Sequence, residues 1–403
     1  MTKDEKINTL CLIIIIGITI AIVFHFLIMG IIFKQGYPRN TFLFRPDDRF
    51  NDFYNPLRGA SDLDPYNPDR IYYIGGYLPF GYIVAFLFSF IRPWIISLFI
   101  LLYGFIIYLG LYIGKNLYDG EAIKGAKKIL RVVCIAYLTY PVLFVIDRAN
   151  FDMVIFILLS VVILMYQSDS FILSVFPLSF AIAMKMYPGF FLLLYFVDRK
   201  FKELFYVLIL VLFLSIGSLA LLHGGFWTEL QKAIVSFDRA REISFEIGRL
   251  IGFNSSLYTV LVFAISSFFP NIASNIIFNI SYIFIAMSII FIVTTMIIIN
   301  DYAFWQKILL IVVMMILLFP SSSDYRLLML YLPMMLFIQN NVKTKNDLII
   351  VIIIGLLLVP KAYINLYSEA NIGIVLNPLL LMSLMVVSLV TRSDHLPNSV
   401  KYQ

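Results

Sequence analysis

Charged residues are scarce in this sequence. They make up 13% of its 403 residues, whereas soluble domains carry about 25%. Hydrophobic residues make up 61% and aromatic residues 16%, and the mean hydropathy is +0.93. Side chains this apolar cannot all be hidden in one water-soluble core, so a lipid bilayer must solvate most of the chain. The composition thereby excludes an ordinary soluble globular protein.

Cysteine, histidine and nucleotide-binding motifs are scarce too. The two cysteines, Cys11 and Cys134, both lie in apolar runs, unlike the cysteines of a disulfide or a metal site. The three histidines, His25, His223 and His395, are scattered along the chain. The sequence shows no P-loop and no glycine-rich dinucleotide loop. Its net charge of +6 is modest and is typical of membrane-anchoring lysines and arginines. We therefore expect no cofactor and no nucleic-acid partner.

Long apolar runs are abundant instead. A helix needs about 20 apolar residues to cross a bilayer, and ten segments approach that length. They are roughly 9–33, 93–114, 129–147, 151–166, 203–222, 274–299, 306–320, 326–339, 347–362 and 373–391. Three further segments, 77–91, 171–197 and 255–269, are too short or too interrupted to cross simply, and we predict re-entrant or half-helices there. The predicted fold is all-α and polytopic, with about 10–13 transmembrane or half-spanning helices.

The loops between these runs predict an orientation. The first run exceeds the roughly 7–15 residues of a signal-peptide core, and no small-x-small cleavage site follows it, so we expect an uncleaved helix that starts in the cytoplasm. Ten crossings then place three short, basic loops inside. These loops are 115–131, 198–202 and 340–347. Two large loops, about 34–92 and 223–273, lie outside. We expect one domain, 1–403, in the inner (cytoplasmic) membrane of a bacterium, with both termini cytoplasmic.

The two outer loops have distinct compositions. The first contains "FNDFYNPLRGASDLDPYNPDR" (50–70), with four acids and two arginines. It lies beside the predicted broken helices, where chemistry on a lipid-borne headgroup would take place. The second outer loop has apolar residues at roughly helical spacing, which predicts a partly amphipathic helix lying flat on the outer leaflet. Those residues are Phe226, Trp227, Leu230, Ile234 and Phe237.

A series of short motifs across about residues 45–330 resembles glycosyltransferase family 87. The motifs are "DFYNPLRGASDLDPY" followed by "YLPFGYIVAF", then "RANFDMVIFILL", "LSFAIAMKMYPGFFLLLYFVDRKFK", "FNSSL" and "FPSSSDYR". The resemblance implies the GT-C fold and an inverting transfer of one hexose from a polyprenyl-phosphate donor. The acceptor would be an envelope glycan or glycolipid on the periplasmic or outer face of the membrane.

The sequence departs from that family at two motifs. Arg148 and Ala149 stand where the family has Gly-Gln, and Ser323 and Tyr325 or Arg326 replace a Trp and a His. In size and layout the chain is also similar to the serotype-converting O-antigen glucosyltransferases. These departures leave the sugar open between mannose, glucose and others.

One carboxylate of the first outer loop is the predicted base. Glycosyl transfer from a lipid phosphate needs a base for the acceptor hydroxyl and positive charge for the departing phosphate. Asp52 lies in the Asp-Phe pair that resembles the family, and we predict that it is the general base. Without the family resemblance, Asp52 also suits a helix cap or an ion pair with Arg49 or Arg58. Asp47 and Asp48 are alternatives for the base, and the pair also suits a divalent metal, which we do not favour.

Three cations are predicted to bind the donor phosphate: Lys185, Arg326 and Arg148. An intramembrane lysine is costly and by default indicates a function, and Pro188 breaks the helix just after Lys185. A lysine here can instead snorkel to the headgroups or pair with an acid such as Asp152. A guanidinium suits phosphate oxygens, although Arg326 also suits a surface anchor.

Five further residues are predicted to contact the sugar or the acceptor. They are Asn150, Tyr54, Tyr77, Asp324 and Asn254. Asn150 matches a family asparagine, but it is as well placed to cap a helix. Tyr77, with Tyr72 and Tyr73, can stack on sugar rings or belong to an aromatic belt.

Two other functions compete with the glycosyltransferase. A secondary transporter or lipid-linked glycan flippase also has broken helices and an intramembrane lysine. Against it, charge is concentrated in one outer loop and no inverted repeat is evident. A polysaccharide ligase is a closer alternative within the same chemistry.

Overall fold

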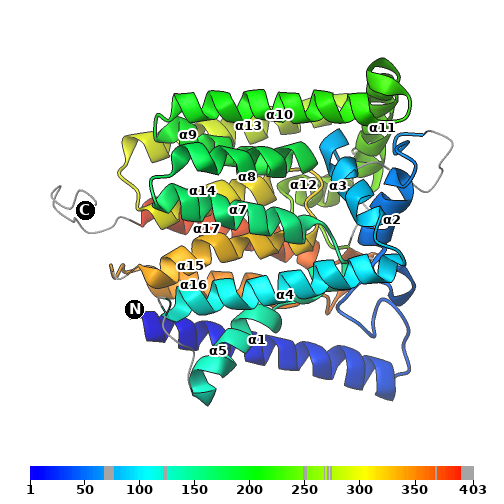
Figure 1. The fold of residues 1–403 in the computed structure, drawn as a ribbon. Helices are drawn as coiled ribbons and strands as arrows, with labels where there is room; N and C mark the ends of the chain where they lie inside the picture. The colour runs from blue at the N-terminus through cyan, green and yellow to red at the C-terminus, as the bar shows by residue number, and fades with distance from the viewer. Residues whose placement is uncertain are drawn as a thin grey trace.

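The fold is a bundle of helices that run roughly along one axis (Figure 1). The computed structural model describes residues 1–67, 77–118, 125–247, 252–266, 275–340, 342–367 and 370–391, with a few single residues between these ranges. Tyr72 and Tyr73 lie outside the described residues. Two short strands, β1 (Asn365–Tyr367) and β2 (Ala370–Asn371), pair antiparallel before the last helix.

Several helices are long and apolar enough to cross a membrane. In the described part of the chain there are five such single helices. They are α1 (Lys3–Ile22) with its π-helical continuation η1 (Val23–Ile32), α4 (Trp94–Tyr118), α10 (Phe201–Leu221), α13 (Ile276–Ile299) and α17 (Gly373–Val390). α5 (Ala126–Tyr137) and α6 (Tyr140–Arg148) are apolar enough to pass the same test together but meet at a bend of 56°, the geometry of a broken span or of a re-entrant loop. The chain is therefore a predominantly helical, multi-pass membrane protein, as predicted, but five of the described helices, or six with the bent pair, are long and apolar enough to span, fewer than the ten predicted.

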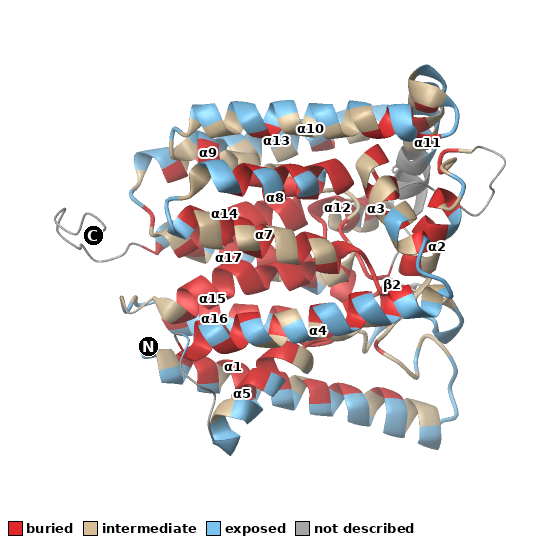
Figure 2. Cartoon of the chain, viewed as in Figure 1, coloured by how far each residue is buried: buried red, intermediate tan, exposed pale blue. Residues whose placement is uncertain are grey.

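Shorter apolar helices fill the centre of the bundle. They are α7 (Asp152–Gln167), α14 (Phe304–Leu317), α15 (Tyr331–Gln339), which continues the 3-10 segment η5 (Asp324–Leu330), and α16 (Asp347–Leu357). α14 is apolar around nearly its whole circumference and almost all of its residues are buried, as expected of a core helix. Figure 2 shows buried residues concentrated in the middle of the bundle, whereas α1, α4 and α10 expose apolar faces. These outer faces suit contact with lipid.

The three segments predicted to be broken are short or interrupted helices. Two of them are α3 (Pro79–Ser89) and α12 (Leu257–Ser266). The third divides into α8 (Phe171–Met184), η3 (Tyr187–Phe191) and α9 (Leu192–Val197). Lys185 has an extended backbone at the end of α8, and Pro188 in the next turn has no backbone N–H to continue the helical ladder. The break places the lysine at a helix end.

The two ends of the bundle differ in content. One end, here called the α2 end, carries α2 (Asn51–Ala60), α3 and α11 (Gly225–Ile247), and the other end carries the N-terminus (Figure 1). The chain returns to this second end after α17, because Asn346 donates to the Thr391 hydroxyl at 2.8 Å while the adjacent Asp347 pairs with the Met1 amine at 3.0 Å. Met1 and Thr391 thus lie at the same end, which agrees with an even number of crossings.

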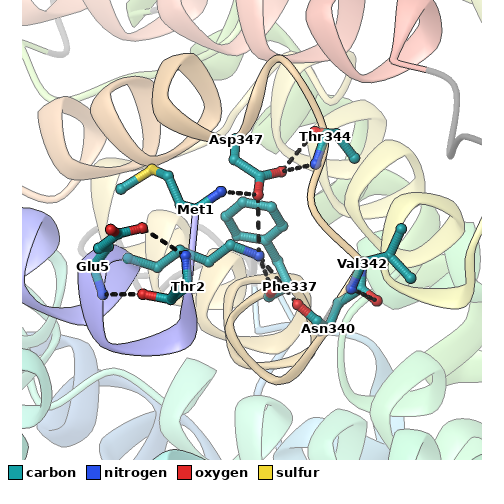
Figure 3. A network of polar contacts seen from close by, with 9 residues as sticks. Met1, Thr2, Glu5, Phe337, Asn340, Val342, Thr344 and Asp347 are labelled. Atoms are coloured by element: carbon teal, nitrogen blue, oxygen red, sulfur yellow. Dashed lines mark hydrogen bonds and ion pairs between the residues drawn. The ribbon is translucent and has the colours of Figure 1, made fainter.

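A buried ion pair joins three helices at the N-terminal end. The Lys6 ammonium lies 3.6 Å from a carboxylate oxygen of Asp347, and both side chains are almost fully buried. It also donates to the carbonyl oxygens of Phe337 at 3.1 Å and Asn340 at 3.2 Å. Figure 3 shows Asp347 between the Met1 amine and Thr344, which donates to the same carboxylate. α1, α15 and α16 are tied together by this network.

The contribution of the Lys6–Asp347 pair to stability can be tested by substitution. Replacing Asp347 by Ala leaves the buried Lys6 ammonium without its carboxylate, and we expect the free energy of unfolding to fall by about 3–5 kcal/mol. The measurement is denaturant unfolding in detergent. Replacing both residues, Lys6→Met with Asp347→Leu, removes the uncompensated charge and should restore most of the loss. A single Asp347→Ala variant as stable as the wild type would contradict this account.

The two outer-loop regions hold each other at the α2 end. Lys232 of α11 donates to Asp64 and to Glu229, each at 2.8 Å. The backbone N–H of His223 donates to the Leu63 carbonyl at 2.9 Å. Although partial burial acts against it, these side-chain hydrogen bonds raise the pKa of Lys232, so the lysine stays charged. The loop after α2 and the start of α11 therefore form one connected structure.

The apolar residues predicted to form an amphipathic helix lie on α11. Trp227 and Ile234 are exposed, with 75% of Trp227 accessible, whereas Leu230 and Phe237 are half-buried against the core. The predicted helix is confirmed. Its position flat on a membrane leaflet stays a prediction.

Candidate functional site

Residues from five chain segments meet at the α2 end in one series of ion pairs and hydrogen bonds. The segments are α2 with the turn before it, the end of α6, the start of α7, the end of α8, and η5. The contacts run Asp48–Arg148–Asp52–Asn150–Lys185–Asp152–Arg326. We call this set of residues the ionic chain. Sequence separations of 96 to 100 residues between its first members show that tertiary packing assembles it.

Both oxygens of Asp52 accept hydrogen bonds. Arg148 donates to Oδ1 at 2.5 Å, and Asn150 donates to Oδ2 at 2.7 Å. Asp52 lies in the first turn of α2, where a negative charge is favoured by the helix dipole. Its partner is thus Arg148 and neither Arg49, which pairs with Asp147 at 3.0 Å, nor Arg58. Each carboxylate oxygen has two lone pairs, so Asp52 can still accept a further proton.

The outer end of the ionic chain is formed by Asp48. Arg148 donates to its Oδ2 and to its backbone carbonyl, each at 2.7 Å, and Asn51 donates to its other oxygen. The predicted alternative Asp47 is exposed to solvent. The Arg148 guanidinium also lies over the Phe44 ring at 4.3 Å. Arg148 is therefore fixed by two carboxylates and an aromatic face.

Lys185 is fully engaged inside the protein. Its ammonium donates to Asp152 Oδ1 at 2.5 Å and to Asn150 Oδ1 at 2.9 Å. It also lies 4.6 Å from the Tyr77 ring centre and 5.9 Å from that of Tyr325. The extended backbone at the end of α8 directs this lysine toward the start of α7. Lys185 is buried and paired, so it does not snorkel to the surface.

Arg326 is held by aromatic rings. Its guanidinium lies 4.4 Å from the Tyr187 ring centre and 4.8 Å from that of Phe319. The side chain is buried, and its Nε and Nη1 atoms have no hydrogen-bond partner. Nε lies 4.0 Å from Asp152 Oδ2, which is also without a hydrogen-bond partner. Arg326 therefore keeps N–H groups that no acceptor in the described part of the protein uses.

Solvent access decreases among the three carboxylates of the ionic chain. The exposed fraction of the side chain is 34% for Asp48, 21% for Asp52 and 0% for Asp152. Three carboxylates and three cations balance in formal charge. The arrangement places a partly accessible carboxylate, Asp52, near the surface and the buried cations Lys185 and Arg326 farther along the ionic chain.

Two predicted contact residues have other partners. The Asp324 carboxylate accepts from Ser255 at 2.5 Å, Tyr140 at 3.0 Å and Asn377 at 3.2 Å. Its hydrogen bonds join η5 to α6, to α17 and to the segment before α12. These hydrogen bonds connect four segments of the chain, which gives Asp324 a structural role.

Asn254 likewise connects two loops. Its amide donates to the Pro320 carbonyl at 3.1 Å, and its oxygen accepts from the backbone N–H groups of Ser256 and Ser322. Of the tyrosines predicted to bind sugar, Tyr77 is buried beside Lys185. Tyr54 is half-buried and its ring packs edge-on against Phe53.

Asp152 is not among the residues predicted from the sequence to bind substrate or to act as the base. It was predicted only as a possible ion-pair partner of Lys185, and the structure confirms that pair. The sequence feature that could have pointed to Asp152 is its place as an acid at the start of an apolar run, two residues after Asn150. Within the residues that the structure describes, no group of three or more His, Cys, Asp or Glu side chains is placed to hold a metal ion.

Comparison with known proteins adds no assignment. No protein-family model, no curated protein and no solved structure matches the chain.

Proposed function

We propose that this chain is an inverting glycosyltransferase that moves one hexose from a polyprenyl-phosphate donor to an envelope glycan or glycolipid. The α2 end is proposed to face the periplasm or exterior of a bacterial cytoplasmic membrane. The observation that carries the proposal is the ionic chain, in which an accessible carboxylate, Asp52, is connected to the buried cations Lys185 and Arg326. The motif series that resembles glycosyltransferase family 87 supports the same reaction.

The proposed reaction uses these groups in one displacement. The acceptor oxygen attacks the anomeric carbon of the donor sugar, and its proton passes to Asp52. The bond between the anomeric carbon and the phosphate oxygen breaks, and its electron pair stays on the lipid phosphate. Lys185 and Arg326 stabilise the charge that develops there. Because the leaving group is an ionised phosphate, no general acid is needed.

The orientation has its own support. Lys200 and Lys202 lie beside α9 and the start of α10, and Lys127 and Lys128 lie at the start of α5. These lysines belong to the short, basic loops that the positive-inside rule assigns to the cytoplasm. The α2 end then faces the opposite side, where lipid-linked sugars are available without a nucleotide site.

The experiment is a donor screen with purified protein. Synthetic polyprenyl-phosphate hexoses are offered with lipid-linked glycan acceptors, and release of lipid phosphate and glycosylated product is measured. Turnover with at least one donor supports the proposal. Consumption of none, together with movement of a lipid-linked glycan across proteoliposomes, would favour the transporter or flippase instead. Buried charges within a membrane domain also suit transport, so both assays are run on the same preparation.

A further inference from the structure

The buried end of the ionic chain holds a carboxylate where a phosphate-binding site would hold only cations. Asp152 is completely buried and lies between Lys185 at 2.5 Å and Arg326 at 4.0 Å. An acid among phosphate-binding cations opposes the binding of an anion. Its place in the site therefore requires an explanation beyond the proposed reaction.

The two cations differ in how they are satisfied. The Lys185 ammonium has two oxygen partners, Asp152 and Asn150. Arg326 has rings on its faces but no hydrogen-bond acceptor at Nε or Nη1. Asp152 also keeps one oxygen, Oδ2, without a hydrogen bond. The aromatic contacts thus hold Arg326 in position while its Nε and Nη1 groups have no acceptor among the described residues. An anion of suitable size would accept hydrogen bonds from these groups.

The charge of the ligand changes during the proposed reaction. The sugar donor is a phosphodiester with one negative charge, whereas the released lipid phosphate is a monoester with about −1.5 to −2 charges at pH 7. Two buried cations, Lys185 and Arg326, without a buried acid would bind the product more tightly than the substrate, and product release would then limit turnover. A fixed carboxylate beside Lys185 reduces that difference.

We infer that Asp152 is an internal counter-anion that positions Lys185 and limits how tightly Lys185 and Arg326 retain the lipid phosphate product. The inference rests on the proposed function, and it names the phosphate monoester of a long-chain alcohol as the ligand that these two cations bind. Asp152 is a positioning residue, because it acts through Lys185 and Arg326.

The test is binding of a phosphate monoester to Asp152→Asn. The probe is farnesyl phosphate in detergent, and its dissociation constant is measured calorimetrically without turnover. With the carboxylate charge removed, we expect the dissociation constant to fall about tenfold. This is a conservative value for the loss of a charge a few ångströms from the ligand at an effective dielectric constant of about 20. Asp152→Glu keeps the charge and should bind as the wild type does. Asp198→Asn is the matched control. Asp198 pairs with Lys307 at 2.8 Å and accepts from Tyr166, which lies at the end of α7 away from Asp152.

Two further arms separate the sources of phosphate. Inorganic phosphate should show the same direction of change with weaker affinity, whereas phosphatidylglycerol, a phosphodiester with one negative charge, should show a smaller change in the same direction. If Asp152→Asn does not fold, Asn150→Asp adds a second carboxylate beside Lys185 and should weaken farnesyl phosphate binding about tenfold. Unchanged affinity in folded Asp152→Asn, or in Asn150→Asp where Asp152→Asn does not fold, would overturn the inference.

The outcome for the proposed function is independent of this result. Tighter binding in Asp152→Asn without any glycosyl transfer in the wild type would leave the anion site standing and remove the proposed reaction. Transfer in the wild type, with kcat and KM for the donor unchanged in Asp152→Asn, would keep the reaction and remove the role of Asp152. A fall in kcat that accompanies tighter product binding is the expected pattern.

Discussion

Asp52→Asn is expected to lower glycosyl transfer roughly 10²–10⁴-fold, the usual contribution of a general base. The amide keeps the shape of the side chain and can still accept one hydrogen bond from Arg148, but it cannot take the acceptor proton. Arg148 also keeps its ion pair with Asp48 at 2.7 Å. We therefore expect a loss of about 2–4 kcal/mol in the free energy of unfolding, because the hydrogen bond from Asn150 is lost and the one from Arg148 is weakened. The measurement is steady-state release of lipid phosphate.

Asp48→Asn is the comparison that isolates the role of the base. Asp48 and Asp52 pair with the same guanidinium, so each substitution removes one carboxylate partner of Arg148. If the loss of the ion pair were the cause, both variants would lose activity equally. A much larger loss for Asp52→Asn identifies the base, and the reverse order would transfer that role to Asp48. Asp64→Asn, in the same outer loop, should keep its activity because Asp64 pairs with Lys232 of α11.

The sequence predicted helices well because the bilayer constrains them strongly. Long apolar runs have few alternatives to a spanning helix, since backbone polar groups in lipid must be satisfied within the segment. The interruption near Lys185 was also predictable, because Pro188 cannot continue the hydrogen-bond ladder. The short central helices were predicted as spans, although burial inside the protein accounts for the apolar character of α14 just as well.

The partners within the site could not be predicted from the sequence. Asp52 and Arg148 are 96 residues apart, and apolar periodicity does not say which helix ends meet. The sequence therefore offered Arg49 and Arg58 as nearby partners, whereas the structure supplies Arg148. Similarly, Asp324 was predicted to contact the sugar or the acceptor, and the structure shows its carboxylate bonded to Ser255, Tyr140 and Asn377. Local spacing identifies candidate residues, and tertiary contacts decide their roles.

Lys185→Met is expected to destabilise the protein and to abolish transfer. The substitution leaves the Asp152 carboxylate buried without its close cation, because Arg326 is 4.0 Å away. An uncompensated buried charge of this kind costs about 3–5 kcal/mol, which is a large part of the stability of an ordinary domain. Loss of activity in this single variant cannot by itself separate a structural role from a catalytic one.

The double variant Lys185→Met with Asp152→Asn separates the two roles. It removes one positive and one negative charge, so the formal charge of the ionic chain is unchanged. The Asn150 oxygen keeps its bond from the backbone N–H of residue 152, at 2.9 Å in the native protein. We expect part of the lost stability to return in thermal unfolding, because the close Lys185–Asp152 pair is removed as a whole, whereas Arg326 loses the carboxylate that lies 4.0 Å away. Transfer should nevertheless stay at least about 10²-fold below the wild type, since one donor to the departing phosphate is missing. A double variant that recovers both stability and turnover would show that Lys185 serves only to neutralise Asp152, and the phosphate would then have to be stabilised by Arg326 and Arg148 alone.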